Sequence, residues 1–149
     1  MTKKDHPSTR FTMIVCPYPL FVRDGKILLA RRINTDYMPG MYSLPAGHEE
    51  KDERMLACLA REVQEEIGLT FVPQDAQLVH VMHRNELDVR MDLFFLIKTW
   101  RGEPVIKEPH KCDDVDWFPL SDPPKQTVPY IRLAIENWRH GTLYFETGW

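Results

Sequence analysis

The sequence predicts a single domain of the α/β or α+β class, with a mixed central sheet and helices on both of its faces. Strand-like segments fall into two groups, and two amphipathic helices interrupt them. At 149 residues, of which 43% are hydrophobic, the chain is long enough to bury one ordinary core. No repeat or linker divides it, so we expect residues 1–149 to form one domain.

The first half of the chain indicates three strands before the first helix, with expected bounds of 10–22, 27–30 and 41–46. Pro17 and Pro19 cannot donate hydrogen bonds to a strand ladder, so the first strand is expected at a sheet edge or a bulge. Asp24 and Gly25 form a hairpin turn before the second strand, and residues 34–40 form a loop before the third.

The first helix is expected over residues 53–67, because an apolar stripe recurs at Leu56, Leu59, Val63 and Ile67. Gly68 is its natural left-handed stop. The elements expected after it are a hairpin of strands 76–84 and 89–100, a short strand over 117–120 and a helix that opens at Pro129 and ends near Gly141. The aromatic tail after that helix is expected to pack back on the domain.

The end of the first helix carries three carboxylates on one strip of its surface. At about 100° per residue, Glu65 and Glu66 lie roughly 60° and 40° to either side of Glu62. Glu65 and Glu66 fall at the negative end of the helix dipole, where each anion costs about 0.3–1 kcal/mol. Runs of glutamate are usually solvated, but this strip borders the apolar stripe and so lies at the lip of a core. A hard divalent cation, Mg²⁺ or Mn²⁺, is the simplest compensation for these anions.

The spacing around this strip resembles a family motif. Gly47, five residues, Glu53, seven residues and then Arg61-Glu62-Val63-Gln64-Glu65-Glu66-Ile67-Gly68-Leu69 match the Nudix box, Gly-x5-Glu-x7-Arg-Glu-U-x-Glu-Glu-x-Gly-U with U an apolar aliphatic residue, at every specified position. Ala46 stands where many relatives have a second glycine. The resemblance implies an α/β/α sandwich, with the box as a loop, helix and loop. It also implies a Mg²⁺-dependent or Mn²⁺-dependent enzyme that hydrolyses diphosphate linkages in nucleotide compounds.

The resemblance further implies roles for the box residues. The expected metal ligands are Glu62, Glu65, Glu66 and the carbonyl of Gly47. Arg61 is expected to steady a catalytic carboxylate through an ion pair. Glu53 lies on the opposite side of an ideal helix from Glu62, so it either precedes the regular helix or has a structural role. The general base is expected among these glutamates or in a later acidic loop that carries Glu108, Asp113 and Asp114.

Residues outside the box bear on the substrate. Arg31 and Arg32 could clamp phosphate, with one side chain pointing inward and the other outward. Tyr37, Phe94 or Trp117 could stack on a base, although a core position is the ordinary role of the last two. The downstream marks of the ADP-ribose, dinucleoside polyphosphate and NADH subgroups are absent. We therefore expect a pyrophosphohydrolase of nucleoside triphosphates or modified nucleotides that releases a monophosphate, with ADP-ribose or sugar nucleotides as the alternative.

Other classes of protein and site stay open at this point. A catalytically inactive Nudix-fold binding module is one, although the intact glutamates argue against it. An isoprenoid isomerase of the same fold is another, and it would need a catalytic cysteine near the site. A zinc site could draw on His80, His83, His110 and Cys112. It is disfavoured because the first two histidines would point to opposite faces of a strand.

Composition and charge limit the classes of partner that we expect this protein to bind. A net charge of −3 gives no basic field for duplex DNA or RNA. No apolar run approaches the ~18 residues of a membrane span, and the start of the chain lacks a signal-peptide core, so we expect a cytoplasmic protein with no membrane partner. The cysteines, Cys16, Cys58 and Cys112, are expected to be free thiols. Because dimers are common in the family, the resemblance leaves a homodimer open.

Overall fold

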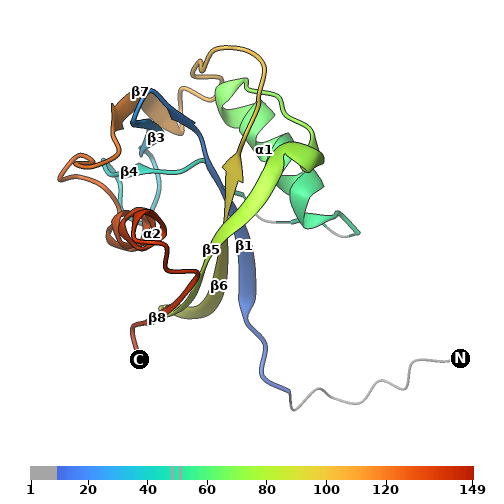
Figure 1. Cartoon of the computed structure of the whole chain (residues 1–149), viewed down its shortest axis with the longest axis vertical. Helices are drawn as coiled ribbons and strands as arrows, with labels where there is room; N and C mark the ends of the chain where they lie inside the picture. Colours follow the sequence, from blue (N-terminus) through green and yellow to red (C-terminus); the bar gives the residue numbers. More distant parts are fainter. Residues whose placement is uncertain (1–9, 48, 51) are drawn as a thin grey trace, which may run out of the picture.

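The structure, a computed structural model, describes residues 10–47, 49–50 and 52–149. Over these residues the chain forms two four-stranded sheets, two α-helices and one short 3₁₀ helix (Figure 1). The strands are β1 (Ile14–Leu20), β2 (Val22–Arg23), β3 (Lys26–Arg32), β4 (Tyr42–Ser43), β5 (Ala76–Glu86), β6 (Asp88–Ile97), β7 (Cys112–Pro119) and β8 (Tyr144–Thr147). The helices are α1 (Met55–Ile67), η1 (Pro73–Asp75) and α2 (Pro129–Arg139). This mixture confirms the predicted α+β class, although the strands divide between two sheets.

The first sheet has the order β1-β6-β5-β8. Its centre is the antiparallel hairpin of β5 and β6, and β1 and β8 join the two sides in parallel register. β1 lies at an edge of this sheet, which confirms the edge position predicted from Pro17 and Pro19. Proline has no N–H group, so it is tolerated in a strand that has a partner on one side only. β8 was expected only as a packed tail, and the structure shows that part of this tail is a strand.

The second sheet is built on β3, which pairs with β2, β4 and β7. Two predicted bounds are wrong here. β7 begins at Cys112, not at residue 117, because antiparallel pairing to β3 keeps an acidic and half-exposed segment extended. β4 covers only Tyr42 and Ser43, since Pro45 cannot continue a ladder.

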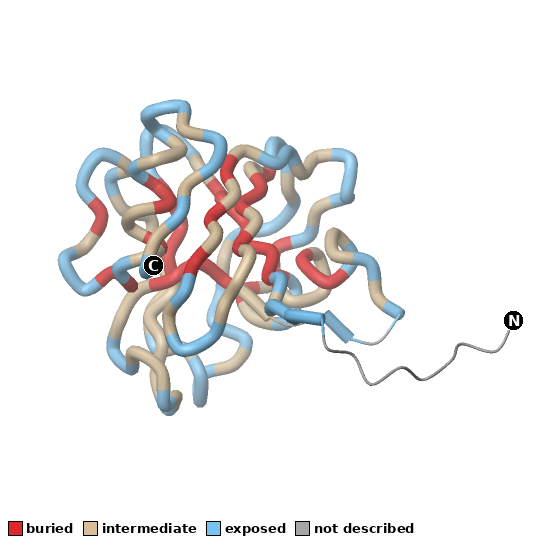
Figure 2. The backbone as a smooth tube through the Cα atoms, turned by 90° about the horizontal axis from the view of Figure 1, so that it is seen from below, coloured by how far each residue is buried: buried red, intermediate tan, exposed pale blue. Residues whose placement is uncertain are grey.

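The two helices lie on opposite sides of the long strands β1, β5 and β6 (Figure 1). Leu59, Val63 and Ile67 on α1 are at most 1% exposed, which confirms three positions of the predicted stripe, whereas Leu56 is only half-buried. Buried segments run through the centre of the molecule and separate exposed loops on either side (Figure 2). α1 ends as predicted at Gly68, which adopts φ 74°, but it begins at Met55 instead of residue 53. No helix in the described ranges is long and apolar enough to cross a membrane.

Candidate active site

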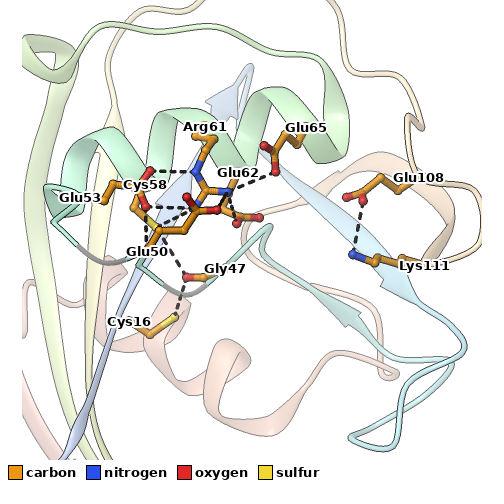
Figure 3. A network of polar contacts seen from close by, with 10 residues as sticks. All are labelled: Cys16, Gly47, Glu50, Glu53, Cys58, Arg61, Glu62, Glu65, Glu108 and Lys111. Atoms are coloured by element: carbon orange, nitrogen blue, oxygen red, sulfur yellow. Dashed lines mark hydrogen bonds and ion pairs between the residues drawn. The ribbon is translucent and has the colours of Figure 1, made fainter.

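Arg61 connects three acidic residues of the box, Glu53, Glu62 and Glu65 (Figure 3). Its Nε and Nη2 donate to the two carboxylate oxygens of Glu53 at 2.8 and 3.0 Å. Its Nη1 donates to Glu62 Oε1 at 2.7 Å and to Glu65 Oε2 at 3.3 Å. Hydrogen bonds from Arg61 are the largest cause of the low pKa of Glu53, about 2. Glu53 therefore precedes the helix and fixes the guanidinium that in turn holds Glu62.

The loop before α1 passes directly against Glu62. A Cβ atom on Gly47 would lie 2.1 Å from Glu62 Cδ and 2.4 Å from its Oε1, so any larger residue here would displace the Glu62 side chain. The Gly47 carbonyl oxygen has different neighbours. It accepts weak hydrogen bonds from the thiols of Cys16 and Cys58, at sulfur–oxygen distances of 3.7 and 3.9 Å (Figure 3). To serve as a metal ligand, this oxygen would have to exchange those donors for a cation.

Glu66 is half-buried beside Glu62, and its carboxyl group holds a proton tightly. Burial raises the pKa of Glu66 to about 8, and the charge of Glu62 is the next cause. Glu108 raises the pKa further, whereas the ammonium group of Lys111 lowers it. Glu62 and Glu66 place two carboxyl groups beside each other, and a hard divalent cation bound there would favour the ionised form of Glu66. The residues thus fit Mg²⁺, although over the described ranges no group of three metal-binding side chains is already assembled.

Of the three acids predicted to lie in a later loop, Asp113 and Asp114 are on β7, and only Glu108 lines the cleft of the box carboxylates. Asp113 forms a bidentate pair with Arg31, at 2.7 and 3.1 Å. Asp114 accepts a short hydrogen bond from the Tyr42 hydroxyl. Glu108 lines the same cleft as Glu62 and Glu66, and its carboxylate contacts Lys111 Nζ at 3.3 Å (Figure 3). The main-chain N–H groups of Lys111 and Cys112 bond to the Glu108 carbonyl oxygen, which fixes the loop at this point.

This cleft has a volume of about 400 Å³ and carries both acidic and basic side chains. Its charged lining residues are Arg31, Arg32, Glu62, Glu66, Glu108 and Lys111. Arg31 and Arg32 are both among the residues that line this cleft, and a register shift between them in the pairing of β3 with β7 interrupts the strand alternation. The Arg31 guanidinium pairs with Asp113, whereas Arg32 Nε donates to the Tyr37 carbonyl oxygen. Which of the two arginines contacts phosphate stays a prediction.

A second cavity, of about 270 Å³, adjoins the first and shares Arg32, Ser43, Ala46 and Gly47 with it. We call it the tyrosine pocket, because Tyr18, Tyr37 and Tyr130 line it together with Cys16, Arg84, Glu86, Leu87 and Arg90. The Tyr37 hydroxyl donates to Glu86 Oε1 at 3.1 Å. The guanidinium carbon of Arg84 lies 3.6 Å from the centre of the Tyr130 ring.

Of these pocket residues, sequence reasoning found only Arg32, Tyr37 and Gly47. One signal could have indicated Arg84, since a charged residue in the apolar alternation of β5 must meet a partner. That partner is the fully buried Asp92 on β6, which accepts from Arg84 Nε at 2.9 Å. Tyr18 and Tyr130 carried no such signal, because aromatic residues are ordinary at core positions.

Other aromatic and histidine candidates lie away from both cavities. Phe94 is fully buried and stacks on Tyr18, with ring centres 5.0 Å apart, and Trp117 packs under Arg23. His80 is buried and its Nδ1 donates to the Thr142 carbonyl oxygen at 2.8 Å. His83 instead packs against Trp149, with ring centres 4.8 Å apart and the ring planes tilted by 54°. These contacts give no support to a zinc site.

Comparisons with known proteins agree with the geometry. The family model of the NUDIX domain matches residues 13–137. An NAD-capped RNA hydrolase NudC of Stutzerimonas stutzeri is 30% identical over 122 residues, which are 80% of this chain and 40% of that protein. An 8-oxo-dGTP diphosphatase of Escherichia coli K12 is 33% identical over 86 residues, 57% of this chain and 65% of that protein. The chain thus spans well under half of the first of these relatives.

Solved structures give the same result. The crystal structure of a MutT NUDIX hydrolase from Burkholderia pseudomallei matches with a TM-score of 0.75 and 28% identity, over 83% of this chain and 95% of that one. The NUDIX domain of Shewanella oneidensis NrtR, solved with ADP ribose, shares the fold at a TM-score of 0.69 and 19% identity, over 94% of this chain and 98% of that one. Motif, fold and family model together show that the chain belongs to the Nudix family of hydrolases.

Proposed function

We propose that this protein uses Mg²⁺ to hydrolyse a diphosphate bridge in a nucleotide compound and releases a nucleoside monophosphate. One observation carries the proposal. Two half-buried carboxyl groups, Glu62 and Glu66, lie beside each other in a cleft that is also lined by Arg31, Arg32 and Lys111. Acids at one point and cations around it suit a substrate that brings several negative charges together with a metal ion.

Each charged residue has a distinct part in this proposal. Glu62, Glu65 and Glu66 would hold the cation, and Mn²⁺ fits the same oxygen ligands. A bound divalent ion neutralises the diphosphate and lowers the pKa of water. Glu53 and Arg61 keep Glu62 in position through their paired hydrogen bonds. Glu108 is our candidate for the general base, because Asp113 and Asp114 are committed to Arg31 and Tyr42. The Gly47 carbonyl stays a weaker candidate ligand.

The remainder of the substrate would occupy the tyrosine pocket. This pocket continues from the cleft through Arg32, so a diphosphate bound in the cleft can place its attached nucleoside among the three tyrosines. Aromatic walls favour a planar ring over an isolated sugar. Arg32 is tied to the Tyr37 carbonyl oxygen at 3.2 Å and is our candidate contact at the junction between phosphate and nucleoside.

Nucleoside triphosphates and modified nucleotides are the first candidates, in line with the relative named 8-oxo-dGTP diphosphatase. A diphosphate that joins two nucleosides is the second, because the NudC relative matches 80% of this chain. ADP-ribose and sugar nucleotides are further candidates, and an inactive binding module is the alternative outside catalysis. A cytoplasmic location and a homodimer remain predictions.

A panel of these compounds tests the proposal, with Mg²⁺ and Mn²⁺ as cofactors and formation of the nucleoside monophosphate, separated by ion-exchange chromatography, as the readout. On the substrate that reacts, we expect Glu65→Gln and Glu66→Gln each to lower turnover at least about a hundredfold, as loss of an electrostatic contact to the reacting group would. Thermal unfolding would show that both variants stay folded. Glu136→Gln, the same change at an exposed position of α2, is the matched control and should keep full turnover.

Two results would overturn parts of the proposal. Unchanged turnover in both box variants would remove the metal assignment. Silence of the unaltered protein across the whole panel, with nucleotide binding retained, would favour the inactive binding module.

A further inference from the structure

The tip of the hairpin between β5 and β6 borders the tyrosine pocket, and its apex residue has three unusual properties. Leu87 is 89% exposed, although it is a large apolar residue. Its backbone adopts φ 59°, in the left-handed region. Leu87 is nevertheless one of the residues that line the pocket. Each of these properties can occur alone. Leu87 combines all three at the edge of a cavity.

Folding does not account for a leucine at this position. A bulky residue with positive φ is strained, and glycine or asparagine would adopt the same conformation at less cost. An exposed apolar side chain gains nothing from burial in the folded chain. Residues of this kind concentrate at binding sites, where the strain is retained for a function.

The neighbouring residues hold this apex in place over the pocket. Glu86 accepts a hydrogen bond from the Tyr37 hydroxyl at 3.1 Å and another from Arg84 Nη1 at 3.0 Å. Arg84 is itself 3% exposed and fixed by its stacking on Tyr130. These contacts fasten the hairpin tip to the loop that carries Tyr37. These contacts hold Leu87, a solvent-exposed apolar residue, at the edge of the pocket.

We propose that Leu87 is a specificity-determining residue that covers the planar ring of the substrate in the tyrosine pocket. The inference rests on the proposed function, which places the nucleoside there. On binding, the ring gains an apolar contact on one side, and Leu87 gains the burial that the free protein lacks. A diphosphate without an attached ring reaches only the cleft and gains nothing from Leu87.

The test compares Leu87→Gly and Leu87→Asn with the unaltered protein in Mg²⁺. The probes are the non-hydrolysable α,β-methylene ATP and α,β-methylene GTP, with methylenediphosphonate as the ring-free reference. Both variants should weaken nucleotide binding about tenfold and leave the affinity for methylenediphosphonate unchanged. Both should melt at the same temperature as the unaltered protein or higher, because they relieve the strain. Leu143→Asn, at a 60% exposed leucine outside both cavities, is the control and should not alter binding.

The outcomes separate this inference from the proposed function. Unchanged nucleotide affinity in both variants of a protein that hydrolyses nucleotides would overturn the inference alone. A lower melting temperature in both variants would also overturn it, since Leu87 would then be structural. Weakened binding in a protein without hydrolytic activity would support the inference and count against the proposed reaction. Absence of nucleotide binding by the unaltered protein would overturn both.

Discussion

Burial beside Glu62 makes Glu66 a weak acid in the metal-free protein. Its pKa is about 8 in the folded chain, against an ordinary value of 4.5. Between these two values the folded chain keeps a proton that the unfolded chain releases. The free energy of unfolding should therefore fall as the pH rises through this window and level off above about pH 8.

Melting curves in EDTA between pH 5 and pH 9 test this contribution of Glu66. The unaltered protein should lose thermal stability toward the alkaline end, and Glu66→Gln should lose clearly less. Glu136→Gln supplies the control for a glutamate outside the cleft. Parallel curves for Glu66→Gln and the unaltered protein would show that the carboxyl group is ionised throughout.

Gly47 offers a second prediction at the scale of one residue. Its φ lies outside the left-handed region, so alanine is compatible with the backbone, but the added Cβ would collide with Glu62 Cδ at 2.1 Å. The flexible end of Glu62 can move aside, at the expense of its hydrogen bond to Arg61. We expect Gly47→Ala to lower kcat at least about tenfold and the melting temperature by a few degrees at most. An unaffected kcat would mean that the exact position of Glu62 is unimportant.

Residue spacing was enough to predict part of the site. The angular positions of Glu62, Glu65 and Glu66 follow from helix geometry, and the stop at Gly68 follows from its conformational freedom. The partner of Glu53 could not be predicted in this way. It depends on the reach of the Arg61 side chain back across the turn before α1. The tyrosine pocket was missed because its lining comes from segments distant in sequence.

At the scale of elements, α1 begins without the usual capping group. Its N-cap residue is Arg54, which has the extended backbone of a cap, with φ −78° and ψ 145°, but forms no side-chain cap bond. The first turn contains no acidic residue. The first turn of α1 therefore supplies no stabilisation that would compensate for the energetic cost of the carboxylates in its last turn.

Arg54→Asp should stabilise the protein by about 0.5–2 kcal/mol, because the new carboxylate can accept from the first free N–H groups of α1 and meets the positive end of its dipole. For a chain of this size, each kcal/mol corresponds to about 2–4 °C in melting temperature. Arg54→Ala separates capping from simple loss of the arginine charge. Equal melting temperatures for the two variants would exclude a capping effect. Arg54 is exposed and lines neither cavity, so turnover should not change.

Element boundaries could be predicted where neighbouring residues set them, but not where pairing with a strand distant in sequence sets them. Prolines in β1 indicated an edge strand, and the edge position is confirmed. The acidic first part of β7 looked like a loop, yet it is a strand because β3 supplies its hydrogen-bond partners. The register shift between Arg31 and Arg32 has no clear signature in the sequence of a single strand.

At the scale of the whole molecule, the C-terminal strand β8 completes the first sheet and closes the free edge of β5. The N–H of Val81 donates to the Leu143 carbonyl oxygen at 2.7 Å, and His80 Nδ1 donates to that of Thr142. Burial lowers the pKa of His80, which favours the neutral ring in this contact. β5 also carries Arg84 and Glu86 to the tyrosine pocket, so the support of this strand reaches from the C-terminus to the proposed binding site.

Removal of residues 142–149 should therefore affect both stability and binding. The buried His80 would lose its acceptor, at about 1–3 kcal/mol for an unsatisfied polar group, and β5 would become an exposed edge open to pairing between molecules. We expect the melting temperature to fall by at least about 5 °C, light scattering to rise on heating, and nucleotide affinity to weaken. Removal of Gly148 and Trp149 alone leaves β8 in place and is the matched control. If the shorter chain melted and bound nucleotide like the control, β8 would be dispensable, and the support of the tyrosine pocket would have to come from the β5–β6 pairing alone.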